Sequence, residues 1–225
     1  MKTIILLRIS IITVYSQNWE SNVTSSNFVK TKAQRGAGAY YYKLTSDSFK
    51  FCCFSQTSAT YYSSAVYSYS ITKSQYYEGN SVTNCPCSWH IFLLYQGNIK
   101  FNHINVSETT LTGWDILLAH GSDSSSLMNT YLNNKLDIVH RVDSYHEVIE
   151  KTNFVKCQKV SNSYGMFLGN SHLKDCFVLD CHFPRLQYWS SYSVTLENTF
   201  FFNTTFDSPT SIETKNDRPH TFKLK

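Results

Sequence analysis

The chain has 225 residues, of which 42% are hydrophobic and 16% aromatic, and this apolar content excludes a chain that is disordered throughout. Only 16% of the residues are charged, and the net charge of +4 comes without a run of five or more basic residues. This pattern argues against a nucleic-acid partner. Ser, Thr and Asn fill the polar positions, which favours β-structure with short turns over surface helices.

The N-terminal segment 1–17 has a basic start at Lys2 and a short apolar run that Arg8 interrupts. These features predict either a weak secretory signal peptide, cleaved near Ser16, or a first cap strand of the fold. The run is too short for a good membrane span, so we expect the protein to meet a membrane only by association.

Three Asn-x-Ser/Thr triplets, at Asn22, Asn105 and Asn203, are candidate glycosylation sites. They support export, and therefore an extracellular or cell-surface location. The seven cysteines are compatible with an oxidising compartment, although their odd number leaves at least one thiol free or paired outside the chain.

Residues 18–206 carry a degenerate repeat marked by large apolar anchors that lie 23 to 27 residues apart. The anchors are Phe28, Phe54, Tyr77, Ile104, Tyr131, Phe154, Phe177 and Phe200. A small polar residue follows each anchor three places later: Thr31, Thr57, Asn80, Ser107, Asn134, Cys157, Asp180 and Asn203. A period of this size indicates one supersecondary unit per repeat, stacked into a solenoid.

The stretches around the anchors are rich in aromatic and β-branched residues and too brief for helical periodicity. A second apolar patch follows many anchors, as at Val66-Tyr67 and Ile116-Leu117. Two short strands per step predict an all-β fold, a single-stranded right-handed parallel β-helix of about eight coils. We expect the anchors to form its core. The small polar residues then form a hydrogen-bonded ladder at the turns, where side chains of Ser107 and Asn203 would point into the coil.

Short segments with small, aromatic and amide residues are Gly36–Tyr40, Cys52–Ser55, Asp175–Phe177 and Asn198–Asn203. They resemble the Gly-Gly-Ala-Ile-Tyr and Asn-Cys-x-Phe-x-x-Asn repeats of pectate-lyase-like β-helix surface proteins of parasitic protists, and distantly those of bacterial polymorphic outer-membrane proteins. The resemblance covers about residues 26–206 and implies a secreted or surface protein with an adhesive role. The polar segment 207–225, which contains Pro209 and Pro219, predicts a tail or an imperfect cap.

The acidic pair that best suits polysaccharide cleavage is Asp175 and Asp180, with His182 and Arg185 nearby in the sequence. Both aspartates fall where neighbouring repeats have Asn or Thr, which favours a turn-capping role. We therefore predict no catalytic residue and no cofactor.

Cys85, Cys87 and His90 have the residue types of a zinc site. One residue between the cysteines is an unusual spacing and a fourth ligand is not evident, so we expect a disulfide or buried thiols and no metal. Cys157 and Cys181 are the pair that adjacent coils would bring together, and they are the candidate disulfide.

The sixteen tyrosines include runs such as Tyr40–Tyr42, Tyr61-Tyr62 and Tyr76-Tyr77, which cannot all point inward. Exposed tyrosines suit the binding of sugars or of a protein, although the ordinary preference of Tyr for strands explains them too. We predict a non-catalytic structural or adhesive module that binds glycans or host proteins. Two alternatives stay open: a polysaccharide lyase or glycoside hydrolase on the same fold, and a truncated fragment of a larger surface protein. The oligomeric state is left open.

Overall fold

The computed structural model describes most of the chain and contains every strand named below. The described residues are 12–15, 20–34, 37, 40–44, 46–70, 74–95, 97–112, 115–120, 124–136, 138–142, 147–160, 166–168, 170–186, 193–207, 212–215 and 222–224. All regular secondary structure in these segments is β-strand, which confirms the predicted all-β class. The same segments contain no helix that could cross a membrane.

Three long parallel sheets run along the molecule, and each strand pairs with its equivalents one repeat away. Sheet A contains β1 (Ile12–Tyr15), β5 (Tyr40–Leu44), β9 (Ser63–Ser70), β12 (His90–Tyr95), β15 (Asp115–His120), β18 (Ile138–Val142) and β21 (Phe167–Leu168). Sheet B contains β2 (Glu20–Thr24), β6 (Ser46–Lys50), β10 (Gln75–Glu78), β13 (Ile99–Asn102), β16 (Ser124–Leu127), β19 (Glu147–Glu150), β22 (Ser171–Lys174), β25 (Val194–Glu197) and β28 (Ile212–Lys215). Sheet C contains β3 (Asn27–Val29), β7 (Cys53–Ser55), β11 (Ser81–Thr83), β14 (Asn105–Ser107), β17 (Thr130–Leu132), β20 (Asn153–Val155), β23 (Phe177–Leu179) and β26 (Phe200–Phe202).

A fourth side links sheet C back to sheet A. In it β4 (Lys32–Ala33) pairs with β8 (Ser58–Ala59). Farther along, β27 (Thr204–Phe206) pairs with β24 (His182–Phe183) on one side and with β29 (Phe222–Leu224) on the other. Between these two groups, isolated parallel bridges join neighbouring repeats at Cys87, Leu111, Thr110, Lys135 and Gln158.

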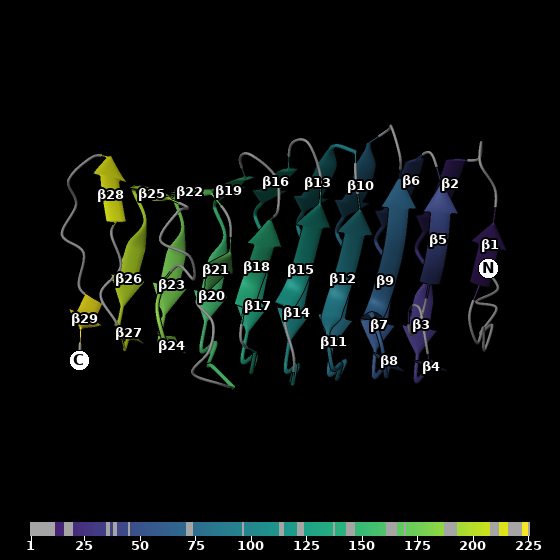
Figure 1. The fold of residues 1–225 in the computed structure, drawn as a ribbon, viewed down its shortest axis with the longest axis horizontal. Coiled ribbons are helices and arrows are strands. Elements are labelled where there is room, and N and C mark those ends of the chain that lie inside the picture. The colour runs from purple at the N-terminus through teal and green to yellow at the C-terminus, as the bar shows by residue number, and fades with distance from the viewer. Residues whose placement is uncertain are drawn as a thin grey trace, which may run out of the picture.

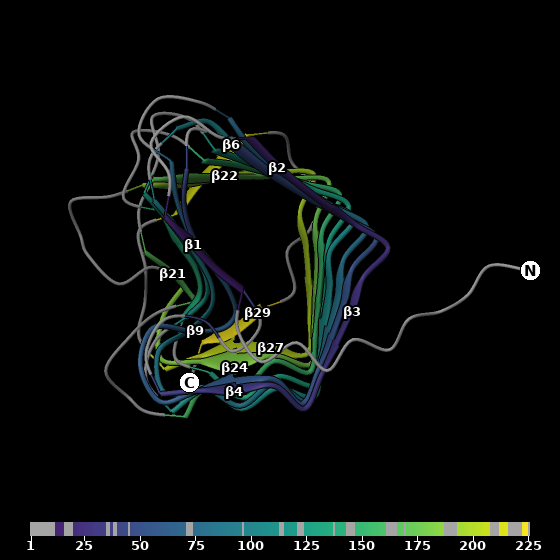
Figure 2. The same ribbon diagram turned by 90° about the vertical axis from the view of Figure 1, so that its right-hand side faces the viewer.

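The repeats stack along the long axis of the molecule (Figure 1). Seen along that axis, sheet B, sheet C, the fourth side and sheet A follow one another around a common centre (Figure 2). This arrangement is the predicted parallel β-solenoid, because every turn of the chain places equivalent segments side by side. Its right-handed winding stays a prediction.

Two corners of each coil turn through a residue with positive φ, between 47° and 64°. The first corner, between sheets B and C, has Ser25, Phe51, Gly79, His103, Met128, Lys151, Asp175 and Asn198. The second, between sheet C and the fourth side, has Lys30, Gln56, Asn84, Glu108, Asn133, Lys156, Asp180 and Asn203. Glycine is the residue that accepts this conformation without cost, and at Gly79 it also makes room for Phe51, whose Cδ1 lies 2.6 Å from the place of an added Cβ.

Aromatic and aliphatic side chains from all four sides fill the interior, and those of sheets B and C form two columns. The column from sheet C consists of Phe28, Phe54, Val82, Val106, Tyr131, Phe154, Val178 and Phe201, all buried. Neighbouring rings in it stack, with centroids 5.0 Å apart for Phe28 and Phe54 and 5.1 Å apart for Tyr131 and Phe154. Parallel stacking one coil apart is the favourable arrangement for aromatic pairs that share a column.

Four of the predicted core anchors, Phe28, Phe54, Tyr131 and Phe154, lie in the sheet C column, whereas Tyr77 is buried in the sheet B column beside Phe49. The prediction was wrong for Phe177 and Phe200. Phe177 is 46% exposed and Phe200 is half-buried, and the two rings stack on the outer face with centroids 5.7 Å apart. In both strands three apolar residues are consecutive, and the corner conformation turns the middle one inward.

The chain termini add strands at the two ends. Within the segment predicted as a signal peptide or cap strand, Ile12–Tyr15 forms β1 and pairs with β5, whereas residues 1–11 and the proposed cleavage site at Ser16 lie outside the described residues. At the other end, β28 and β29 pair with β25 and β27. Part of the segment predicted as a polar tail or cap therefore continues the solenoid.

Candidate functional site

The residue after each positive-φ corner points inward and supports the turn. These inner corner residues are Ser26, Cys52, Asn80, Ile104, Asn129, Thr152, Cys176 and Thr199 at the first corner, and Thr31, Thr57, Cys85, Thr109, Asn134, Cys157, Cys181 and Thr204 at the second. They are buried in every coil after the first. Most can accept or donate one hydrogen bond over a short reach, which is what a buried turn needs.

At these corners the asparagine side chains hydrogen-bond to backbone groups of the preceding coil. Asn80 Oδ1 accepts from the Cys52 amide at 2.9 Å, and its Nδ2 donates to the Phe49 carbonyl at 3.0 Å. The residues of the predicted polar ladder do not form one column, because they occupy different positions of the coil. Asn80 and Asn134 lie at opposite inner corners, Ser107 ends a strand of sheet C, and Asp180 and Asn203 lie on the outer side of the second corner. The anchors share a residue type but not a register, because Tyr77 lies in sheet B and Ile104 at the first inner corner.

Five cysteines occupy the same inner corners and have a structural role. The Cys181 thiol, for example, donates to the Phe154 carbonyl at 3.4 Å. Burial raises the pKa of Cys52 and of Cys85, and raises that of Cys176 to about 12. Buried thiols of this kind are poor nucleophiles, because the thiolate is the reactive form.

The candidate disulfide pair lies where the sequence placed it, in adjacent coils. Cys157 and Cys181 are free thiols that hydrogen-bond to each other. This contact, together with burial, raises the pKa of Cys181.

The residues considered for zinc do not converge. The Thr57 hydroxyl donates to Cys85 Sγ at 3.2 Å, the Trp89 amide donates to Cys87 Sγ at 3.4 Å, and His90 pairs with Asp115. Among the described residues, no three His, Cys, Asp or Glu side chains come together as a metal site. The structure gives each of these three residues a separate role in the fold.

Ser63, His90 and Asp115 form a column of register partners in sheet A that was not predicted from the sequence. Aligning positions one period apart would have revealed it. These are the residue types of a hydrolytic triad, but all three are buried, and the Ser63 hydroxyl donates to the Ile91 carbonyl. Since a nucleophile must meet its substrate, this column supports a structural role.

Asp175 and Asp180 lie at opposite ends of β23, at the first and second corners. The Asn203 side-chain amide donates to Asp180 Oδ1 at 2.6 Å. His182 Nε2 lies 3.7 Å from Asp207 Oδ1. The two carboxylates do not face a common space, as two carboxylates flanking a sugar bond must. Their positions favour the turn role that the sequence suggested.

All three candidate glycosylation asparagines, Asn22, Asn105 and Asn203, are exposed. The expectation that Asn203 points into the coil was wrong, because it occupies the outward positive-φ position of its corner. Each side chain is therefore accessible to a modifying enzyme.

An exposed aromatic cluster lies where the fourth side meets sheet A, just before β9 and β12. This cluster, termed the aromatic platform, consists of Tyr61, Tyr62 and Trp89, which are 45%, 38% and 38% exposed. The Trp89 ring meets both tyrosines edge to face, with centroids 6.4 Å from Tyr61 and 5.9 Å from Tyr62. The Tyr62 ring also stacks on the Tyr67 ring, with centroids 5.3 Å apart.

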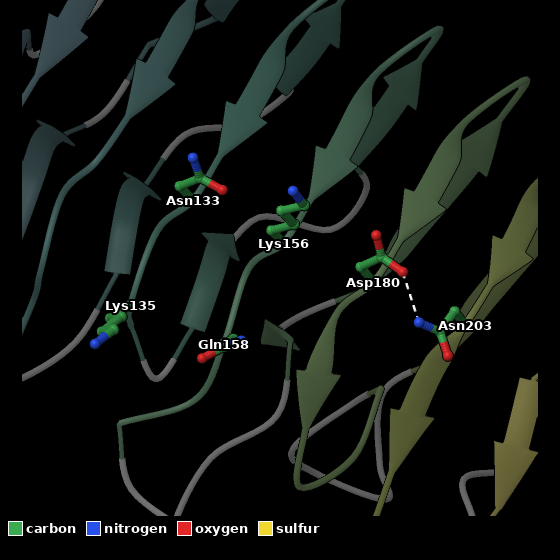
Figure 3. A pocket seen from close by; sticks show the side chains of 6 residues that line it. All are labelled: Asn133, Lys135, Lys156, Gln158, Asp180 and Asn203. Carbon is green, nitrogen blue, oxygen red and sulfur yellow. Dashed lines mark hydrogen bonds between the residues drawn. The ribbon is translucent and has the colours of Figure 1, made fainter.

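A polar groove of about 560 Å³ lies farther along the solenoid, on the outer surface at the second corner. Its lining comes from successive coils and consists of Asn133, Lys135, Lys156, Gln158, Asp180 and Asn203 (Figure 3). The groove is open to solvent and none of its lining residues is hydrophobic.

No protein-family model, curated protein or solved structure matches this chain.

Proposed function

We propose that the protein is a non-catalytic binding module, secreted or on the cell surface, whose aromatic platform binds the sugar rings of a glycan. The observation that carries this proposal is the exposure of Tyr61, Tyr62 and Trp89 together, on two adjacent coils. A flat aromatic face stacks against the C–H face of a pyranose, and the phenol hydroxyls can bond to sugar hydroxyls at the same time. Large apolar side chains gathered on a surface commonly mark a binding site.

The platform is held in place before any ligand arrives. Tyr62 has φ of 71° although it lies outside the two corner columns, a conformation unusual for a bulky residue. Its carbonyl accepts from the His90 amide at 2.9 Å, so the next coil fixes the strained backbone. Strain retained at an exposed position supports a functional role, and a rigid aromatic surface loses little entropy on binding.

The absence of catalysis is also part of the proposal. Two observations support it: Ser63, His90 and Asp115 are buried, and the carboxylates of Asp175 and Asp180 lie at different corners. The surface location is supported by the exposure of Asn22, Asn105 and Asn203, which export would make available for glycosylation.

The test is binding of the full chain to immobilised neutral oligosaccharides, followed by calorimetry on those that bind. We expect Trp89→Ala to weaken binding by about tenfold, the loss of about one stacking contact. Phe202→Ala is the matched control, because Phe202 is also an exposed aromatic residue but lies on sheet C, and it should leave binding unchanged.

Binding that survives Trp89→Ala in a folded variant would overturn the platform proposal. New reducing ends or unsaturated sugars in the incubated glycan would establish the enzyme alternative instead. Binding to a surface protein but to no glycan would show that the ligand class is wrong.

A further inference from the structure

The polar groove carries unpaired positive charge. Lys135 and Lys156 are both exposed, and neither ammonium has an ion-pair partner within the part of the chain that the structure describes. The one carboxylate in the lining, on Asp180, accepts from the Asn203 amide at 2.6 Å. The groove therefore presents two cations that are free to meet an external anion.

The lining residues repeat along the solenoid axis. Asn133, Lys156, Asp180 and Asn203 occupy the second corner in four consecutive coils, and Figure 3 shows them in a row. Parallel strands lie about 4.8 Å apart, so a polar side chain is offered at each such step, a donor from Asn133, Lys156 and Asn203 and an acceptor from Asp180. That step is close to the length of one sugar unit in an extended chain.

The polar character of the lining narrows the class of ligand. Amide groups of Asn133, Gln158 and Asn203 can donate to hydroxyls and accept from them, as a carbohydrate requires. Acidic peptide motifs are commonly recognised by clusters of arginine, and the lining has no arginine. Charge and hydrogen-bonding capacity together favour an acidic polysaccharide.

We propose that this groove binds the carboxylate or sulfate groups of an acidic glycan, through Lys135 and Lys156. The site is separate from the aromatic platform, which lies on other coils and has no charged member. A result that contradicts one of the two proposals therefore does not contradict the other. The two lysine ammonium groups bind the charged groups of the glycan, and the side-chain amides of the lining hydrogen-bond to its hydroxyls.

The experiment compares binding of the full chain to heparin, polygalacturonate and uncharged dextran at low and at physiological salt. We expect the acidic glycans to bind and dextran not to bind at this site, with affinity falling as salt rises. Replacing both lysines (Lys135→Ala with Lys156→Ala) should weaken binding by about tenfold or more, because charge-assisted hydrogen bonds are lost.

The chain offers a matched control for the two lysines. Lys30 and Lys32 occupy the same two positions of the coil, at the second corner and on the fourth side, but in the first coil. Lys30→Ala with Lys32→Ala removes the same charge and should change binding less than about twofold. Lys135→Arg with Lys156→Arg keeps the charge and should retain most of the binding.

Three outcomes would overturn the inference: equal losses in the two alanine pairs, binding of polyglutamate or single-stranded DNA as tight as that of heparin, and loss of acidic-glycan binding on Trp89→Ala alone. Circular dichroism and thermal unfolding check that each variant is folded. Failure of Trp89→Ala to affect neutral sugars concerns only the aromatic platform, so the two failures are distinguishable.

Discussion

Asn134 and Thr109 lie in adjacent coils at the second inner corner, where Asn134 Oδ1 accepts from the Thr109 amide at 3.1 Å. The Asn134 Nδ2 group donates to the Val106 carbonyl at 3.0 Å. One buried side chain thus satisfies two backbone groups that the turn removes from the strand ladder. Unpaired buried backbone groups cost free energy, so these bonds are a condition for a sharp corner.

We expect Asn134→Ala to lower the free energy of unfolding by about 1–3 kcal/mol, because it leaves a buried amide and a buried carbonyl without partners. Asn153→Ala, at an exposed position of β20, should change it by less than about 0.5 kcal/mol. Urea unfolding of the two variants measures the difference. Equal effects would mean that the corner amide has no special role.

Asp115→Ala should destabilise the fold by about 3–5 kcal/mol, since it leaves the buried His90 without its carboxylate. The half-buried pair of His172 and Glu197, 3.1 Å apart, provides the comparison. Glu197→Ala should cost less than about 1 kcal/mol, because water screens and replaces that contact. Denaturant unfolding measures both variants. If Asp115→Ala has the same free energy of unfolding as the wild type, the buried pair does not stabilise the fold.

Native thiol labelling should modify Cys53 and spare the other cysteines. Cys53 is the exposed cysteine, and the other six are buried. Iodoacetamide at neutral pH followed by mass spectrometry should find one label on the native chain and seven after denaturation. A denatured chain with two fewer labels, restored by reductant, would establish the disulfide between Cys157 and Cys181.

Stability should fall at alkaline pH. Burial raises the pKa of Cys176 to about 12, above the ordinary thiol value of 9.0, so the folded state holds this proton more tightly than the unfolded state does. The resulting stabilisation is complete below about pH 9 and is lost as pH rises toward 12, by at most about 1.4 kcal/mol per pH unit for one thiol. Denaturant unfolding between pH 8 and about 11 measures this slope.

The control is Cys176→Thr, which places at this corner the residue that Thr152 and Thr199 supply in the adjacent coils. The variant should fold and show a flatter decline with pH. An unchanged slope would mean that Cys176 ionises without effect on folding.

The repeat period and the residue types determined the solenoid by themselves. Short apolar stretches at a step of 23 to 27 residues, each followed by a small polar residue, leave few architectures other than stacked β-coils. The expectation of a disulfide or buried thiols at Cys85 and Cys87 came from their spacing, and both thiols are free and buried. The repeat period also placed Cys157 and Cys181 in adjacent coils.

The tertiary structure decided the register and the surface. Phe177-Val178-Leu179 and Phe200-Phe201-Phe202 are apolar at every position, so the alternation that normally separates the two faces of a strand is absent. Only the positive-φ corners, held by hydrogen bonds from the next coil, turn Val178 and Phe201 inward.

The two candidate binding surfaces have the same origin. Tyr62 and Trp89 are 27 residues apart, and Lys135 and Lys156 are 21 apart, and neither pair forms a local motif. Stacking of coils brings each pair together, and the bends at the corners leave their side chains outside. A local pattern specifies how one coil winds, but which side chains meet across coils depends on loop lengths that only the folded chain reconciles.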